Sequence, residues 1–179
     1  MKLLRPLALL LALAAARLAA ADADDAAVAA TTRTRVGDPV PAFSVTAADG
    51  TVWSTDRLRG KVVVLSLFAT WCPPCNQELP HVERELWQAH RARGLVVLAL
   101  AREEGPEKLG PFARKLGLTF PLVSDPHREV FGKFATNYIP RLYVIGADGR
   151  IKFQSVGFEE AEFPAAVAAV ARELAAGAP

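Results

Sequence analysis

The chain has 179 residues, of which 51% are hydrophobic and 22% are charged. This length suits one domain built around a single buried core. Its 21 lysines and arginines against 19 acidic residues leave a net charge of +2, without a long basic run. We therefore expect no nucleic-acid partner, because such partners select clustered positive charge.

The first 21 residues have the pattern of a secretory signal peptide. Lys2 and Arg5 form a short positive region, residues 6–16 are apolar, and Ala19 and Ala21 offer an A-x-A-like cleavage site. The apolar run is shorter than the roughly 17–25 residues of a spanning helix. We therefore expect export to the periplasm after cleavage, or attachment to the membrane if the segment is retained.

Small and polar residues without a hydrophobic period follow over 22–35, and they predict a flexible linker. Beyond them, two short alternating segments flank Asp49-Gly50, which is the signature of a β-hairpin. The run from Val62 to Phe68 is almost continuously apolar and rich in β-branched residues. Such a run predicts a central strand that is buried on both faces.

A helix is predicted directly after the two cysteines. Four apolar residues spaced three, four and three apart would form its buried face, Pro80 should kink it and Gly94 should end it. These four residues are Leu79, Val82, Leu86 and Ala89. A second buried strand is expected over 95–101.

The second half of the chain predicts further alternation of helices and strands. Residues 105–118 predict a loop and a short helix, 120–125 a short strand, and 127–136 another short helix. A clear hairpin follows, with strands over 142–145 and 151–156 around an Asp148-Gly149 turn. An alanine-rich helix ends at Gly177. This order predicts one α/β domain over 36–176, with a mixed central sheet flanked by helices.

The only cysteines, Cys72 and Cys75, lie in "LFATWCPPCNQELP" over residues 67–80. A disulfide between them would close a very short loop and stabilise the fold little. A structural zinc site needs four ligands, and no second cysteine pair exists. We therefore interpret the two cysteines as a reactive pair that exchanges thiols and disulfides. At a helix N-terminus the pKa of the Cys72 thiol should fall, giving an exposed attacking sulfur with Cys75 one turn further on as a shielded partner.

The stretches "VGDPVPAF", "LRGKVVVLSLFATWCPPCNQELP" and "YIPRLYVIGADGRI" resemble the TlpA/ResA-like branch of the thioredoxin superfamily, including its DsbE/CcmG-like members, across roughly residues 36–175. These are exported thiol:disulfide oxidoreductases. The resemblance implies a thioredoxin fold with an N-terminal β-hairpin extension and a central αβ insertion. It also implies that Cys72 and Cys75 form the redox-active disulfide.

By the same resemblance, the peptide between Ile139 and Pro140 is cis and lies opposite the cysteines, where it would bind substrate together with Trp71. Glu78 matches a glutamate of ResA-like proteins and could accept the Cys75 proton as a mixed disulfide resolves. It could equally be a solvated helix carboxylate. Ser66 stands where cytosolic thioredoxins have a buried aspartate.

One residue departs from the family in a way that leaves two interpretations open. Arg141 follows the cis-proline position, where these families usually have threonine. Its charge could lower the pKa of the Cys72 thiol, or its side chain could point to solvent.

Two other functions compete with thiol exchange. Copper chaperones of related fold generally use a CxxxC motif, one residue longer than the spacing here, although two thiolates can still bind Cu(I). A peroxiredoxin would have Thr or Ser three residues before its reactive cysteine and Pro seven before, where this chain has Ala69 and Leu65.

The resemblance therefore predicts an enzyme that exchanges disulfides with client proteins outside the cytoplasm, as a reductant in cytochrome c maturation or copper-site assembly. A membrane electron donor of the DsbD/CcdA type would supply the electrons. We expect no bound cofactor or metal, because the two cysteines themselves carry two electrons. We also expect a monomer.

Overall fold

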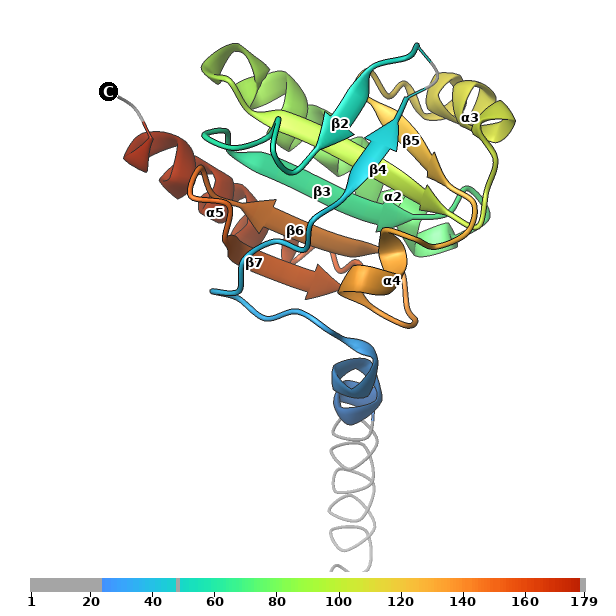
Figure 1. The fold of residues 1–179 in the computed structure, drawn as a ribbon, viewed down its shortest axis with the longest axis horizontal. Helices are drawn as coiled ribbons and strands as arrows, with labels where there is room; N and C mark the ends of the chain where they lie inside the picture. Colours follow the sequence, from blue (N-terminus) through green and yellow to red (C-terminus); the bar gives the residue numbers. More distant parts are fainter. Residues whose placement is uncertain (1–23, 48, 178–179) are drawn as a thin grey trace, which may run out of the picture.

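A five-stranded sheet forms the centre of the computed structural model, which describes residues 24–47 and 49–177. The strand order is β5-β4-β3-β6-β7, with β3 in the middle (Figure 1). The strands are β3 (Val63–Phe68), β4 (Val96–Arg102), β5 (Leu122–Asp125), β6 (Arg141–Ile145) and β7 (Ile151–Val156).

The sheet is mixed. Strands β3, β4 and β5 run parallel to one another, whereas β6 pairs antiparallel with both β3 and β7. All six residues of β3 are buried, as the continuous apolar run predicts for a strand covered on both faces. This is the predicted α/β thioredoxin fold.

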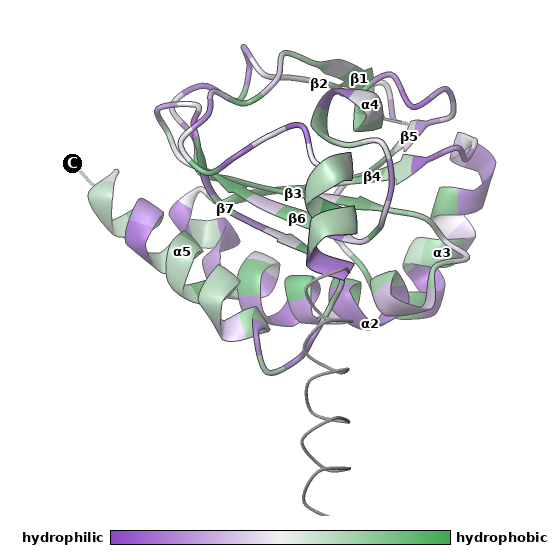
Figure 2. Ribbon diagram, turned by 90° about the horizontal axis from the view of Figure 1, so that it is seen from below, coloured by the Kyte–Doolittle hydropathy of each residue, from purple (hydrophilic) through white to green (hydrophobic). Residues whose placement is uncertain are grey.

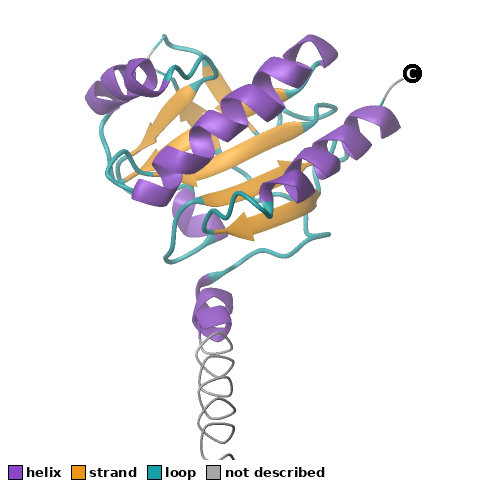
Figure 3. Ribbon diagram, turned by 180° about the vertical axis from the view of Figure 1, so that it is seen from behind, coloured by secondary structure: helices purple, strands orange, loops and turns teal. Residues whose placement is uncertain are grey.

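Helices cover one face of the sheet, and a smaller layer covers the other (Figures 2 and 3). The first face carries α2 (Pro73–His81), α3 (Leu109–Leu116) and α5 (Phe163–Ala176). The opposite face carries α4 (Phe131–Phe134) and the antiparallel hairpin of β1 (Ser44–Thr46) and β2 (Val52–Ser54). The N-terminal hairpin extension, the β6–β7 hairpin and the final helix are therefore confirmed.

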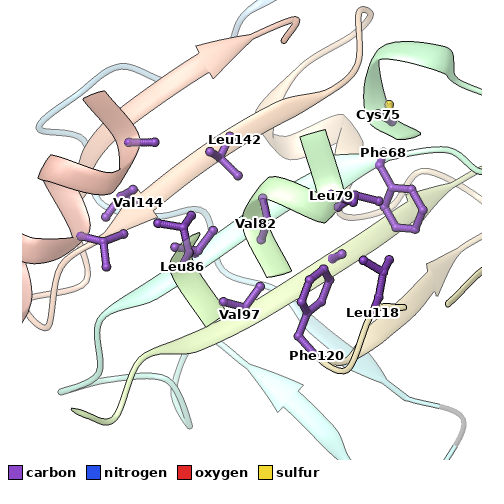
Figure 4. Close-up of a cluster of buried hydrophobic side chains, with 14 of the residues drawn as sticks. Phe68, Cys75, Leu79, Val82, Leu86, Val97, Leu118, Phe120, Leu142 and Val144 are labelled. Atoms are coloured by element: carbon purple, nitrogen blue, oxygen red, sulfur yellow. The ribbon is translucent and has the colours of Figure 1, made fainter. Parts of the chain in front are cut away.

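The buried apolar side chains divide into one cluster on each face of the sheet. The cluster under the helices contains Phe68, Leu79, Phe120 and Leu142, and Cys75 lies at its edge (Figure 4). Both cysteines belong to this cluster, so the redox pair packs against apolar side chains.

The helix after the cysteines is less regular than predicted. The α-helical part ends at His81, one residue after Pro80, and a π-helix, η1 (Val82–Gln88), continues it. Its i→i+5 hydrogen bonds widen each turn and shift the inward face. The prediction for Ala89 is therefore wrong, since Ala89 is exposed while Glu83 is buried. A short 3₁₀ turn, η2 (Arg91–Arg93), leads to Gly94, whose φ of 88° ends the segment as predicted.

The segment predicted as a flexible linker over 22–35 is ordered where the structure describes it. Residues 24–31 form a helix, here called the N-terminal helix, and Thr32 pairs with Ala135 in an isolated β-bridge. The prediction failed because the stabilising contacts come from residues about a hundred positions away. The predicted signal peptide over 1–21 lies outside the described residues. In the part that the structure describes, no helix is long and apolar enough to cross a membrane.

Candidate active site

The cysteine pair lies at the junction between the central strand and α2. Strand β3 ends at Phe68, a short loop follows, and α2 starts at Pro73 with Cys72 as its N-cap residue. Pro73 and Pro74 occupy the first turn, where a missing N–H removes no helical hydrogen bond. The local sequence thus places Cys72 at the positive end of the helix.

Cys72 and Cys75 form a disulfide with a Cα–Cα distance of 5.3 Å. The backbone N–H of Cys75 donates to the Cys72 Sγ at 3.2 Å, so this sulfur takes the place of an N-cap oxygen. The prediction of an exposed attacking sulfur needs correction, because Cys72 is only 3% exposed and Cys75 is fully buried. The neighbouring loops enclose the pair, although Cys72 remains the more accessible of the two.

The peptide bond between Ile139 and Pro140 is cis, as the resemblance implies. The Ile139 carbonyl oxygen lies 3.8 Å from the Cys72 Sγ. Pro140 is buried, Ile139 is half-buried, and the preceding Tyr138 is exposed. The cis-proline loop therefore lies directly beside the reactive sulfur.

Trp71 is 60% exposed, which is unusual for a large aromatic residue next to a buried sulfur. The guanidinium carbon of Arg102 lies 5.9 Å from the centroid of its ring, within cation–π distance. Together, Trp71 and the cis-proline loop form the surface surrounding Cys72.

Glu78 is not a solvated surface carboxylate. It is 1% exposed and accepts a hydrogen bond of 2.9 Å from the Ser66 hydroxyl on β3. Burial raises the pKa of the Glu78 carboxyl to about 8, against a smaller lowering by the Ser66 hydrogen bond. An ordinary thiol has a pKa of about 8.5, so the raised pKa of this carboxyl approaches that of a thiol in water.

A cavity of about 570 Å³ opens beside this carboxyl. Its walls come from Glu78, Leu142, β7, the loop over 157–162 and the first turn of α5. Because Glu78 belongs to α2, this cavity adjoins the helix that carries Cys75.

The position of Arg141 contradicts one of the two interpretations that the sequence left open. Its side chain is completely buried, so it does not point to solvent. Its hydrogen bonds go to the carbonyl oxygens of Asn137 and Tyr138 and to the hydroxyls of Thr31 and Thr32, and none goes to sulfur. The guanidinium therefore connects the cis-proline loop to the N-terminal helix.

Glu104 is a site residue that the sequence did not indicate. It is 2% exposed, and its carboxylate accepts from the Thr70 N–H and the Thr70 hydroxyl, each at 2.6 Å. Lys108 lies 3.5 Å from the same carboxylate. Glu104 thus fixes the loop that carries Trp71 and Cys72, from a position more than thirty residues along the chain.

Replacing Glu104 with alanine should destabilise the fold through this loop. The Thr70 amide and hydroxyl would lose a charged acceptor, and we expect the free energy of unfolding to fall by about 2–3 kcal/mol. Denaturant unfolding measures this loss. The exposed neighbour Glu107 provides the control, since Glu107→Ala should change stability little. Equal effects of the two substitutions would remove Glu104 from this role.

Across residues 24–47 and 49–177, no group of three or more His, Cys, Asp or Glu side chains could hold a metal ion. Leu65 and Ala69, which stand at the two diagnostic positions of a peroxiredoxin, are both fully buried apolar residues. The site that the described residues do provide is a disulfide with a buried carboxyl three residues after Cys75.

Comparison with known proteins agrees with this geometry. The model of the AhpC/TSA family matches residues 36–154. The chain is 30% identical to the thiol-disulfide oxidoreductase ResA of Bacillus thuringiensis (strain Al Hakam) over 72% of its own length and 73% of the relative. ResA of Geobacillus kaustophilus (strain HTA426) is 32% identical over 68% and 69% of the two chains.

Two solved structures extend the similarity to three dimensions. A Bacteroides thetaiotaomicron protein solved in solution has a TM-score of 0.77 and 32% identity, covering 81% of this chain and 93% of its own. A thiol:disulfide interchange protein of the thioredoxin family from Chlorobium tepidum TLS has a TM-score of 0.65 and 28% identity, covering 79% and 98%.

Proposed function

We propose that this protein is a reductant that works outside the cytoplasm. The proposal starts from the family: the chain belongs to the AhpC/TSA family and is a thiol-disulfide oxidoreductase of the ResA and DsbE type, which acts on cysteine-bearing client proteins. Its clients would be protein disulfides, as in cytochrome c maturation or copper-site assembly. The observation that carries this proposal is the enclosed Cys72–Cys75 pair, with the cis-proline loop beside Cys72 and the buried Glu78 three residues after Cys75 on the same helix.

Each sulfur has a separate part in the exchange. In the reduced protein, the Cys72 thiolate attacks a client disulfide, forms a mixed disulfide and releases one client sulfur as a thiolate, which takes a proton from solvent. Cys75 then gives its proton to Glu78 and attacks the Cys72 Sγ, which releases the second client sulfur. Two electrons pass to the client, and the Cys72–Cys75 disulfide remains.

The raised pKa of Glu78 suits this proton transfer. A carboxyl with an ordinary pKa would be too weak a base for a thiol, whereas transfer between groups of similar pKa is close to balanced. Ser66 holds the carboxyl in place, and the adjoining cavity returns the proton to solvent. Trp71, Ile139 and Pro140 would hold the client backbone beside Cys72.

The cycle needs a source of electrons and a location. We propose that a membrane electron donor of the DsbD/CcdA type reduces the disulfide again, and that the predicted signal over 1–21 exports the protein to the periplasm or anchors it at the membrane. We expect the enzyme to act as a monomer, since one chain contains both cysteines and the carboxyl.

The reduction potential of the Cys72–Cys75 couple tests the direction of electron flow. Purified protein would be equilibrated with graded thiol/disulfide buffers, and its free thiols counted. A reductant should give a value near or below about −230 mV, in the range of thioredoxin and glutaredoxins. A value near about −120 mV, typical of a strong periplasmic oxidant, would instead identify a disulfide donor and contradict the maturation role.

A further inference from the structure

Arg141 is a buried charge with an unusual set of partners. It is completely buried, and among the described residues no carboxylate forms an ion pair with its guanidinium. A buried charge is costly unless hydrogen bonds satisfy it. Here neutral oxygens do so, through five contacts of 2.9 to 3.1 Å.

These acceptors come from two separate parts of the chain. On one side, Nε contacts the carbonyl oxygens of Asn137 and Tyr138, and Nη2 also donates to Asn137. On the other side, Nη1 and Nη2 donate to the hydroxyls of Thr32 and Thr31. The planar fork of arginine can bridge two such sets of acceptors, which a lysine ammonium cannot.

The hydroxyls of Thr31 and Thr32 are oriented to accept hydrogen bonds from the Arg141 guanidinium. Each hydroxyl donates its own proton to the Val28 carbonyl oxygen at 2.8 Å, which leaves its lone pairs free to accept from the guanidinium. Thr31 ends the N-terminal helix, so the positive charge also lies at the negative end of that helix.

The other end of the bridge reaches the redox site. Asn137 and Tyr138 immediately precede the cis Ile139–Pro140 bond, and Tyr138 has a φ of 60°, in the left-handed region that most residues avoid. The next carbonyl along the chain, that of Ile139, is the one beside the Cys72 sulfur. Few covalent bonds therefore separate the Arg141 contacts from the surface where a client would dock.

We propose that Arg141 is a positioning residue for client docking, and that the N-terminal helix acts as its anchor. The helix and Thr31–Thr32 hold the guanidinium, the guanidinium holds the carbonyls of the cis-proline loop, and that loop receives the client. This inference rests on the proposed function in one respect only, namely that clients bind at the loop.

The effect of Thr31 and Thr32 on Arg141 can be separated from their contribution to holding the N-terminal segment in place. The segment is also held by backbone hydrogen bonds, from the Thr136 N–H to the Thr31 carbonyl and from the Arg33 N–H to the Phe134 carbonyl. Replacing Thr31 and Thr32 with valine leaves these backbone bonds in place. It removes the hydroxyl acceptors of Arg141, together with the bonds that the same hydroxyls donate to the Val28 carbonyl.

The test compares the Thr31→Val/Thr32→Val double variant with the unchanged full-length protein. We expect the Michaelis constant for a disulfide-bridged client peptide to rise about tenfold, as for the loss of a charge-assisted hydrogen bond. The turnover number and the reduction of the enzyme by dithiothreitol should stay unchanged, because dithiothreitol does not use the docking surface. Hydrogen exchange over residues 135–140, followed by mass spectrometry, should become faster.

Two further variants decide the interpretation. Thr34→Val removes a buried hydroxyl of the same segment that pairs with Gln154 and is linked to Arg141 only through the Tyr143 side chain. Both readouts should therefore change much less than in the double variant. In an Arg141→Lys background, the threonine substitutions should add little, because coupled residues are not additive. Full additivity, an equal effect of Thr34→Val, or unchanged exchange would overturn the inference. A wild-type enzyme inactive on the peptide would count against the proposed function, while hydrogen exchange would still decide the role of Arg141.

Discussion

A Cys75→Ser variant is expected to accumulate mixed disulfides between Cys72 and client proteins. In the unaltered chain the Cys75 sulfur is already held beside Cys72, and the two form a disulfide. An external thiol must replace this intramolecular attack in the variant, so release of the client should slow by at least roughly a thousandfold. Non-reducing electrophoresis and mass spectrometry of the adducts measure the effect.

The matched control is Cys72→Ser, which keeps the buried sulfur and removes the more accessible one. It should trap no adduct, because Cys75 is fully buried. If Cys72→Ser captured clients as readily as Cys75→Ser, the roles of the two cysteines would have to be exchanged. If Cys75→Ser captured none, its role as the resolving thiol would be wrong.

Replacing Glu78 with glutamine should slow the same release step by about a hundredfold, the lower range for loss of a general base. In the wild type the rate of release should rise with pH as the Glu78 carboxyl ionises, with a midpoint near its pKa of about 8. The variant should lack this rise, because an amide does not titrate in this range. Stopped-flow measurement of the release rate between pH 6 and pH 9 is the experiment.

The control for this variant is Glu85→Gln. Glu85 belongs to the π-helix that continues α2, but it is half-buried and pairs with His81 rather than with Ser66. Its replacement should leave the pH–rate profile as it is. An unchanged profile for Glu78→Gln as well would assign the buried carboxyl to structure and not to proton transfer.

The raised pKa of Glu78 also makes the stability of the fold depend on pH. Most carboxylates contribute more to stability as pH rises, whereas this one should contribute less. The folded-state pKa of Glu78 is raised from 4.5 to about 8, so between these values the folded protein binds more protons than the unfolded chain. The contribution of this group therefore falls as pH rises from 4.5 to 8, with a limiting slope of about 1.4 kcal/mol per pH unit. Glu78→Gln should gain stability relative to wild type over the same interval.

The features that could be predicted are those encoded by neighbouring residues or by the family pattern. The strand before Cys72, the prolines of the first helical turn and the two hairpins each have a local signature, and the structure agrees with them. The cis bond before Pro140 followed from the resemblance and is confirmed.

The features that could not be predicted depend on contacts between distant parts of the chain. Nothing near Ser66 indicates that its hydroxyl would meet Glu78, or that Glu104 would hold Thr70. The burial of Arg141 could not be predicted, because its threonine partners belong to a segment without hydrophobic periodicity. Ala89 was misplaced since a π-helix cannot be inferred from a spacing that assumes α-helical turns.

The enclosure of the two sulfurs has a consequence for how this couple exchanges electrons with its surroundings. Cys72 is 3% exposed and Cys75 is fully buried, so a thiol diffusing in solution meets little reactive surface. A cysteine presented by a docked protein is held beside Cys72 for longer, so we expect it to react faster than a small thiol. We therefore expect the redox state of the couple to follow docked partner proteins more closely than the bulk thiol pool. For the proposed reductant, this difference in rate would limit the loss of electrons to other thiols and disulfides on the way to its client.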